Sequence, residues 1–579
     1  MAYGYRAMNR IKTDILILGS GGAGLLAALH AHRADPALDI AIAVKGLLGK
    51  SGCTRMVQGG YNVALAPGDS AERHFMDTIE GGKWLNDQDL AWTLVTTAQQ
   101  RIRELENEWG CFFDRNPDGT VHQKAFAGQS FDRTVHKGDL TGIEIMNRLA
   151  EQVWARGISR LEEHRALSLI KAADGSGIAA VLLLDIRSGE SVLVEARAVL
   201  LATGGGPTMY RYHTPSGDKS CDGMAMALRL GLPLRDMEMV QFHPTGLMAG
   251  AGTRITGTII EEGLRGVGGH LLDGNRRRFM PDYDPRAERA TRDIVSRAMV
   301  EQMRAGRTGP NGGVFLTMRH LDAEMVKRSF KGMVERCADV GFDLVSGLVE
   351  VTPTAHYMMG GVRFGLDCST ELPGLYAAGE DTGGVHGANR LGGNGVANST
   401  VFGGIAGAAM AAYLKSGGEH REPDRAAVEA AVAAASAPLG EGGGDLEQVR
   451  DALYAAMWDD AGVIRDAAGL KRAAAKLGEL DAALDRARVP SAPAAFNMAW
   501  QDWLNLKNLV LVSRAVAAAA LEREDSCGAH YRSDFPAEAD ANKAEFTEAR
   551  LEGAAIRIAR VPVAFTRVKP GQSLLKGAA

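Results

Sequence analysis

The chain has 579 residues, of which 46% are hydrophobic and 23% charged, so it is long enough for several globular domains. Its formal net charge is −5 and its basic residues are scattered, which gives no bulk attraction to nucleic acid or to an anionic membrane. The six cysteines lie far apart and form no C-x-x-C motif, which argues against a metal site, an iron–sulfur cluster or a disulfide framework in this chain.

No targeting or membrane-spanning segment is predicted. The N-terminal residues run directly into a strand-like stretch without an apolar signal region, and the apolar stretch at 402–414 is short and rich in glycine. We therefore expect a cytoplasmic protein with no direct membrane span, which reaches a membrane only through partner subunits.

The stretch TDILILGSGGAGLLAALHAH (13–32) predicts a buried strand, a glycine turn and a helix, and residues 39–44 predict the next strand of a βαβ unit. Gly19, Gly21 and Gly24 form a G-x-G-x-x-G motif in that context, where the backbone can approach a pyrophosphate at the helix N-terminus. The second strand ends at Lys45 without the acidic residue of a plain nicotinamide site.

Two further strands run into glycine-rich turns, at 196–206 and at 373–381. Three such turns predict one large nucleotide that meets several strand ends of one sheet; ordinary turns between strands and helices are the alternative. Glu380, at the end of the third strand, is a candidate to bind the hydroxyls of a ribityl chain.

The rest of the chain divides by composition. Residues 240–350 have a mixed character that predicts an inserted domain, and from 425 alanine and charged residues alternate in a helical pattern. The predicted fold class is α/β, with a Rossmann-like nucleotide-binding domain, an inserted α+β capping domain and a C-terminal helical domain. The predicted boundaries are 1–239 and 351–415 for the nucleotide-binding domain, 240–350 for the capping domain, 425–545 for the helical domain and 546–579 for a less regular tail.

Four longer motifs resemble the flavoprotein subunit of the succinate dehydrogenase/fumarate reductase family, which includes L-aspartate oxidase: QFHPTG (241–246), TAHYMMGG (354–361), HGANRLGGN (386–394) and SCGAHYRSDFP (526–536). The resemblance covers nearly the whole chain in order and implies FAD as the cofactor. The FAD site that it implies comprises Gly19, Ser20, Gly21, Gly22, Ala23, Gly24, Lys45, Cys53, Thr54, Gln58, Gly59, Gly60, Thr203, Gly204, Asp222, Glu380 and Asn394.

The same resemblance implies a four-carbon dicarboxylate substrate, with His243, His356 and Arg390 as carboxylate-binding groups. Arg292 is implied as proton donor or acceptor, because hydride transfer at flavin N5 needs a proton on the neighbouring carbon. The implied catalytic and substrate-contacting set is completed by two relay residues and an aromatic residue over the substrate: Glu262, Arg265 and Phe126. Core histidines, a surface ion-pair network and a core phenylalanine are the alternative interpretations.

Three positions depart from the family pattern. Cys53 stands where respiratory members carry a histidine that binds FAD covalently, so we expect non-covalent FAD, with a cysteinyl link or a redox thiol as alternatives. Glu261 stands where the family has a threonine in the substrate pocket. A carboxylate beside a dicarboxylate substrate is unfavourable unless it is protonated, pairs with a neighbouring arginine or points away. Alternatively, it binds a cationic group on a different substrate. Gly395 replaces a serine near the flavin ring.

These observations predict an oxidoreductase that interconverts a C4 dicarboxylate and its alkene, of the succinate/fumarate type. Electrons would pass to or from an iron–sulfur subunit or a soluble carrier. An L-aspartate oxidase-type or other free-standing flavin enzyme is one alternative, and a non-catalytic FAD-binding subunit is another.

Overall fold

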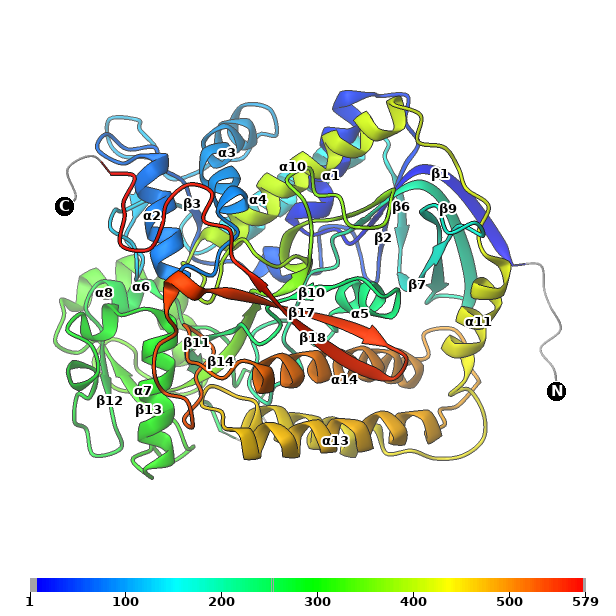
Figure 1. Ribbon diagram of the computed structural model, residues 1–579. Helices are drawn as coiled ribbons and strands as arrows, with labels where there is room; N and C mark the ends of the chain where they lie inside the picture. Colours follow the sequence, from blue (N-terminus) through cyan, green and yellow to red (C-terminus); the bar gives the residue numbers. More distant parts are fainter. Residues whose placement is uncertain (1–7, 251–252, 254, 576–579) are drawn as a thin grey trace.

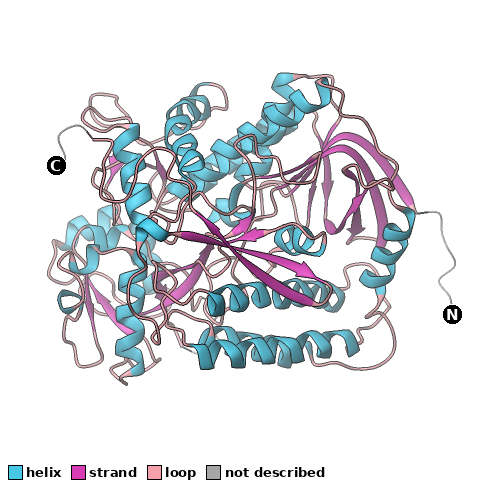
Figure 2. Cartoon of the chain, in the orientation of Figure 1, coloured by secondary structure: helices cyan, strands magenta, loops and turns pink. Residues whose placement is uncertain are grey.

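The computed structural model describes residues 8–250, 253 and 255–575. The outermost residues of the predicted first domain and of the predicted tail, 1–7 and 576–579, lie outside that description. Figure 1 shows the chain coloured along its length, and Figure 2 shows helices packed around several separate sheets.

The largest sheet positions the nucleotide-binding turns. Its strands follow the order β6-β2-β1-β9-β8-β7, and β16 also pairs with β9. β1 runs parallel to β2 and β9, as does β16 to β9, so the predicted βαβ unit is confirmed. The bounds are β1 Asn9–Leu18, β2 Ile40–Val44, β6 Ser159–Glu162, β7 His164–Lys171, β8 Ile178–Asp185, β9 Glu190–Leu201 and β16 Leu375–Ala377.

Two helices run close together beside this sheet, α1 Gly22–Ala34 and α10 Asn394–Lys415. A side chain at Gly407 of α10 would lie 2.1 Å from the Ala27 carbonyl oxygen of α1, so glycine permits this approach. Three further helices and a small sheet, in the order β3-β5-β4, complete this part: α2 Ala71–Gly81, α3 Gln88–Asn107, α4 Thr141–Ala155, β3 Tyr61–Asn62, β4 Gln123–Lys124 and β5 Thr134–Val135.

The capping region is built on its own four-stranded antiparallel sheet, β11-β14-β13-β12. Its buried apolar side chains, from Leu247 to Val351, form a separate cluster, which is why this insertion folds as a unit. The elements are β11 Val240–Leu247, α6 Gly263–Gly266, β12 His270–Leu272, η2 Met280–Asp282, η3 Ala287–Arg289, α7 Arg292–Arg304, β13 Val314–Thr317, α8 Ala323–Ser329, α9 Lys331–Ala338 and β14 Val349–Met358.

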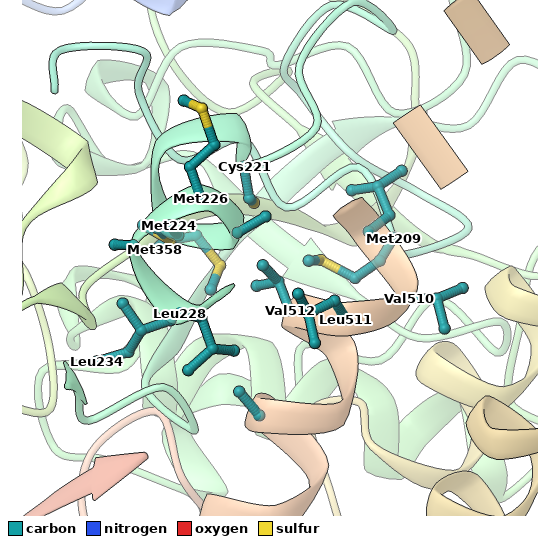
Figure 3. Packing of buried hydrophobic residues seen from close by; sticks show 14 of the residues in the cluster. Met209, Cys221, Met224, Met226, Leu228, Leu234, Met358, Val510, Leu511 and Val512 are labelled. Carbon is teal, nitrogen blue, oxygen red and sulfur yellow. The ribbon is translucent and has the colours of Figure 1, made fainter. Parts of the chain in front are cut away.

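The helices that follow residue 425 divide between two partners. Val428 of α11 packs with Ile170, Ala180 and Leu193 of the large sheet, so α11 lies against that sheet. The later helices form a layer in which α13 and α14 lie side by side (Figure 1), and α14 packs on α5 around Met209, Met224 and Val512 (Figure 3). The bounds are α5 Asp222–Arg229, α11 Arg425–Ser436, α12 Leu446–Ala455, η5 Ala456–Asp460, α13 Ala467–Arg486 and α14 Met498–Glu522.

The prediction of an irregular tail after residue 545 is wrong. Glu545–Glu552 (β17) and Ala555–Pro562 (β18) form an antiparallel hairpin around Gly553, and β17 pairs with β10 in the sheet β15-β10-β17-β18. The buried side of the hairpin rests on α14, which supplies the apolar surface that a two-stranded ribbon needs. The remaining bounds are β10 Leu234–Arg235, β15 Gly361–Val362 and η6 Ala541–Lys543.

Among the described residues, α10 and α14 are long and apolar enough to cross a membrane by length and composition. In each helix 67% of the most apolar window is buried inside the protein. That degree of burial is typical of core helices, because a lipid-facing helix leaves its apolar surface exposed.

Candidate active site

A cavity of about 510 Å³ runs from the large sheet to the capping region. The turns that follow β1, β9 and β16 all open into it, so the three glycine-rich turns meet at neighbouring strand ends as predicted. The predicted residues that line it are Gly19, Ser20, Gly21, Gly22, Ala23, Lys45, Cys53, Thr54, Gln58, Gly59, Gly60, Phe126, Thr203, Gly204, Asp222, His243, Glu261, Glu262, Arg292, His356, Glu380 and Arg390.

The first turn forms a cradle for a diphosphate. Gly19 has φ +108°, and a side chain there would meet the Ala202 carbonyl oxygen at 2.1 Å. Helix α1 begins at Gly22, whose N–H donates to the Thr54 hydroxyl at 3.2 Å, so the helix N-terminus faces the cavity. Gly24 does not line the cavity: a Cβ there would lie 2.0 Å from the Gly19 carbonyl oxygen, so it sets the spacing of strand and helix.

Lys45 and Asp222 meet at the next strand end. The Lys45 ammonium lies 2.8 Å from the Asp222 carboxylate and 3.2 Å from the Ser220 hydroxyl. Burial lowers the pKa of Lys45 to about 8, although Asp222 opposes that shift. Arg165 also pairs with Asp222, at 2.9 Å, and holds the pKa of that carboxyl far below its usual range despite burial. This polar group matches the hydroxyl- and phosphate-rich part of a dinucleotide.

The loop around Cys53 forms one wall of the cavity. Cys53 begins a short helical turn, Cys53–Met56, and its thiol faces the same space as Glu380. Burial raises the pKa of Cys53 to about 12, and the Glu380 carboxylate adds to the shift. Gln58, in the same loop, has a buried Oε1 without a hydrogen-bond partner, so this loop presents an unused acceptor to a bound group.

Glu380 and its neighbour Asp381 close the far side, in the turn Gly379–Asp381. Burial raises the pKa of Glu380 to about 7, even though its carboxylate accepts the Met358 N–H at 3.0 Å. Asp381 accepts the N–H of Gly204 at 3.1 Å and the hydroxyl of Thr203 at 3.0 Å, and so fixes the second glycine turn.

Asn394 is not brought to the cavity. Its side chain hydrogen-bonds His74 and Asn62 at 2.9 Å each and Thr78 at 3.2 Å, all outside the FAD cradle. Buried polar neighbours therefore satisfy the amide of Asn394, and contact of this residue with the cofactor stays a prediction.

Three charged residues form a chain at the capping side. Glu262 accepts Arg265 Nη2 at 2.9 Å, and its two oxygens accept Arg292 Nε at 3.2 Å and Arg292 Nη2 at 2.7 Å. Burial alone would raise the pKa of Glu262, but the two guanidinium groups outweigh it and hold that pKa at about 2. Arg265 does not line the cavity; it lies behind Glu262. Gln241 orients Arg292 further by accepting Nη1 at 2.9 Å.

Two histidines and an arginine face this chain. The rings of His243 and His356 lie 5.5 Å apart, centre to centre. Burial and the nearby Arg292 lower the pKa of both histidines well below their usual value, so both are neutral. Nδ1 of His243 accepts the Thr245 N–H at 3.3 Å, so Nε2 carries the ring proton and acts as a donor.

Arg390 has no carboxylate partner among the described residues. Its guanidinium stacks 4.5 Å over the Tyr357 ring, its Nε has no hydrogen-bond partner, and Nη1 reaches only the Leu391 carbonyl oxygen, at 3.3 Å. Burial and the charge of Arg292 lower its pKa to about 10, which leaves it cationic at neutral pH. A buried, unpaired guanidinium favours an anionic ligand.

Phe126 and Glu261 line the remaining wall. Phe126 packs against Gly59, where an added side chain would meet the ring at 2.4 Å. Glu261 faces the cavity and pairs with Lys124 at 2.5 Å, so of the expected solutions for this carboxylate the structure has a cationic partner, a lysine in place of an arginine.

Sequence reasoning missed several residues of this site: Lys124, Thr214, Gln241, Arg336 and Asp381. Gln241 and Asp381 lie inside quoted motifs, next to residues that were identified, so the signal was present. Thr214, whose hydroxyl lies 2.8 Å from Nδ1 of His356, comes from a loop distant in sequence and carried no recognisable pattern.

Comparison with known proteins places the fold. Residues 14–396 match the family model of an FAD binding domain, and residues 450–574 match that of the fumarate reductase flavoprotein C-terminus. A fumarate reductase (CoM/CoB) polypeptide of Methanothermobacter marburgensis is 41% identical over 530 residues, which are 91% of this chain and 95% of that protein. The fumarate reductase flavoprotein subunit of Escherichia coli is 35% identical over 550 residues, 91% of this chain and 89% of that protein.

Among solved structures, a mutant FrdA chain of E. coli quinol fumarate reductase superposes with a TM-score of 0.91 at 33% identity, covering 98% of this chain and 99% of that chain. The glycine cradle, the buried polar groups at three strand ends and the unused acceptor of Gln58 fit the FAD that these matches indicate. The chain therefore belongs to the flavoprotein subunits of the succinate dehydrogenase/fumarate reductase family and is an FAD-dependent oxidoreductase.

Proposed function

We propose that this chain interconverts a C4 dicarboxylate and its alkene, as succinate and fumarate are interconverted, and that Arg292 gives or takes the proton. The observation that carries the proposal is the charge of the cavity at its capping side. Arg292, Arg336 and Arg390 line this side, and Arg265 lies behind it. Glu262 supplies one negative charge and Lys124 neutralises Glu261, so an excess of positive charge remains for a substrate with two carboxylates.

The two carboxylates have separate partners. The unpaired Arg390 offers a planar, two-pronged donor, and the neutral His243 and His356 offer ring N–H groups without adding charge. Because these donors are buried and held by Tyr357, Thr245 and Thr214, they are oriented before the substrate arrives.

The proton step follows the chain of hydrogen bonds at the capping side. Bound FAD supplies or accepts a hydride at its N5 atom. In the reducing direction, Arg292 donates a proton to the carbon next to the one that gains the hydride, and Glu262 passes a proton from Arg265 to the neutral guanidine. An arginine is a poor acid in water, so its action here depends on the two hydrogen bonds to Glu262, at 2.7 and 3.2 Å, that hold it in place.

Electrons must come from outside the chain. Of its free cysteines, five are buried and scattered, and no group of three or more His, Cys, Asp or Glu side chains among the described residues could hold a metal. We propose an iron–sulfur subunit or a soluble carrier as the partner. The proposed location is cytoplasmic, and partner subunits would bring the chain to the periphery of a membrane. Iron analysis of a complex purified through a tag on this chain tests that partner.

The function is tested with the purified flavoprotein under anaerobic conditions. After reduction of its flavin, addition of fumarate should return the oxidised flavin spectrum, and Arg292→Gln should slow that return by about 10²–10⁴-fold while bound FAD is retained. An unchanged rate in Arg292→Gln would overturn the proton role. Failure of the wild type to respond to fumarate, with formation of peroxide from L-aspartate in air, would favour the aspartate oxidase type instead; no turnover of either substrate would favour a non-catalytic subunit.

A further inference from the structure

One ion pair joins the capping region to the FAD-binding part of the chain at the wall of the cavity. Nζ of Lys124 lies 2.5 Å from Oε1 of Glu261, and the two side chains are 22% and 4% exposed. Among the described residues, no other ion pair links 240–350 to 1–239. The pair therefore lies at the junction between the capping region and the FAD-binding part, beside the substrate end of the site.

Each partner is fixed by its own element. Lys124 lies in β4, which pairs with β5, and its ammonium lies 5.8 Å from the centre of the Phe126 ring. Glu261 directly precedes the relay residue Glu262, and its backbone N–H contacts the sulfur of Met333 at 3.4 Å. Because Glu261 and Glu262 are adjacent in the chain, a shift of the backbone that moves one carboxylate also moves the other.

A bare carboxylate at this wall would oppose the substrate. The remaining cavity charges favour a dianion, and a further negative group at the wall of the same cavity would weaken its binding through Coulomb repulsion. Arg336, which also lines this wall, donates to the Ile259 carbonyl oxygen at 3.0 Å and makes no ion pair within the described part of the chain, so Lys124 is the cation that neutralises Glu261.

We propose that Lys124 determines substrate charge specificity: by neutralising Glu261 it lets the cavity accept a dicarboxylate dianion. Without Lys124 the same wall would favour a C4 acid that carries an ammonium group next to its carboxylates. This inference rests on the proposed dicarboxylate function of the site.

A rescue experiment tests the pair on the complete flavoprotein. Lys124→Met should raise KM for fumarate, and the dissociation constant of malonate measured by calorimetry, by about tenfold or more, with little change in kcat. It should also shift the binding preference from malonate toward L-aspartate, measured as the ratio of their dissociation constants. Glu261→Gln in the Lys124→Met background should restore both the KM for fumarate and the dissociation constant of malonate, because no unpaired carboxylate is left.

Lys507→Met is the matched control. Lys507 is 20% exposed and pairs with Asp481 at 2.6 Å, but it lies in α14, away from the cavity, so its loss should leave all these constants unchanged. Flavin content is measured for every variant, so that a damaged FAD site is recognised.

The outcomes separate the two proposals. If the wild type reduces fumarate but Lys124→Met binds fumarate and malonate as the wild type does, or if Glu261→Gln does not restore binding, the role of Lys124 is overturned while the function stands. If the wild type does not reduce fumarate, the function fails, and malonate binding alone still decides the role of Lys124. A wild type that neither reduces fumarate nor binds malonate overturns both.

Discussion

At the scale of single residues, Cys53 shows how the surroundings decide the chemistry of a side chain. By the family pattern Cys53 stands at the position of the histidine that binds FAD covalently, and it lines the cavity, but burial and Glu380 raise its pKa to about 12. A thiolate is the nucleophile in any attack on the flavin ring, and at neutral pH a group with that pKa is almost entirely the thiol. The environment therefore favours non-covalent FAD.

We predict that acid precipitation releases the flavin. The supernatant should be yellow and the pellet colourless, and Cys53→Ser should bind FAD with an affinity within about threefold of the wild type, since one small polar side chain replaces another. A yellow pellet from the wild type that turns colourless in Cys53→Ser would establish a thioether link and contradict this expectation.

Single residues also mark what the sequence could and could not predict. The motifs placed His243 and Arg390 because each lies in a long, specific pattern, and the family resemblance placed Arg292 through the short pair Arg292–Asp293. They could not show that Lys124 neutralises Glu261, because the two residues are 137 positions apart and meet only when the capping region folds over the small sheet. Asn394 was assigned to the cofactor by its neighbours in sequence, although its side chain points into a polar cluster.

At the scale of elements, the contact between α1 and α10 connects packing to cofactor binding. Glycines at two successive turns of α10, Gly403 and Gly407, face the α1 backbone, where added side chains would lie 2.5 Å from the Ala23 oxygen and 2.1 Å from the Ala27 oxygen. Neither atom belongs to a flexible side chain, so only a shift of a helix could relieve the overlap. A shift of α1 moves the N-terminus that faces the diphosphate cradle.

We predict that Gly407→Ala lowers the free energy of unfolding by about 1–3 kcal/mol and weakens FAD binding. Gly478→Ala is the matched control, because Gly478 also lies inside a helix, α13, but has open space around the position of a Cβ. That change should stabilise the protein by about 0.5–1 kcal/mol, since alanine restricts the unfolded chain. Thermal unfolding and flavin titration of both variants provide the measurements; equal shifts in the two would contradict the packing argument.

The elements that sequence reasoning missed are those whose partners are distant. The period-2 pattern of AIRIARVP after Gly553 does indicate a strand, and its exposure alternates along the chain. In β17, by contrast, the central residues of EFTEARLE are buried on both faces, so its polar residues mark no solvent face. The stability of the hairpin depends on its contacts with α14 and with β10, and β10 lies more than 300 residues earlier in the chain. Neither contact can be predicted from the local sequence pattern. The βαβ unit, by contrast, is local and was predicted correctly.

At the scale of the whole molecule, Arg523 joins three segments that are far apart in sequence. Following the last residue of α14, it pairs with Glu238 at 2.6 Å and Asp236 at 3.5 Å, between β10 and β11, and donates to the Glu545 carbonyl oxygen at 2.9 Å in β17. Burial and the neighbouring Glu238 raise the pKa of Asp236 above its usual value. The guanidinium thus holds two buried carboxyl groups together at the root of the capping region.

We predict that Arg523→Met destabilises the whole molecule by about 3–5 kcal/mol, because it leaves two buried carboxyl groups without their cation. A carboxyl whose pKa is raised in the folded state costs nothing while both states are protonated, and its cost grows as the pH rises from the unfolded pKa toward the folded one. The deficit of the variant should therefore be larger at pH 8 than at pH 5 in thermal unfolding.

Arg514→Met, in the same helix with an ion pair to Asp481 at 3.0 Å and a side chain 22% exposed, should cost less than about 1 kcal/mol at either pH. A deficit of Arg523→Met that stays constant between the two pH values would show that its packing and its bond to Glu545, not its charge, connect the three segments.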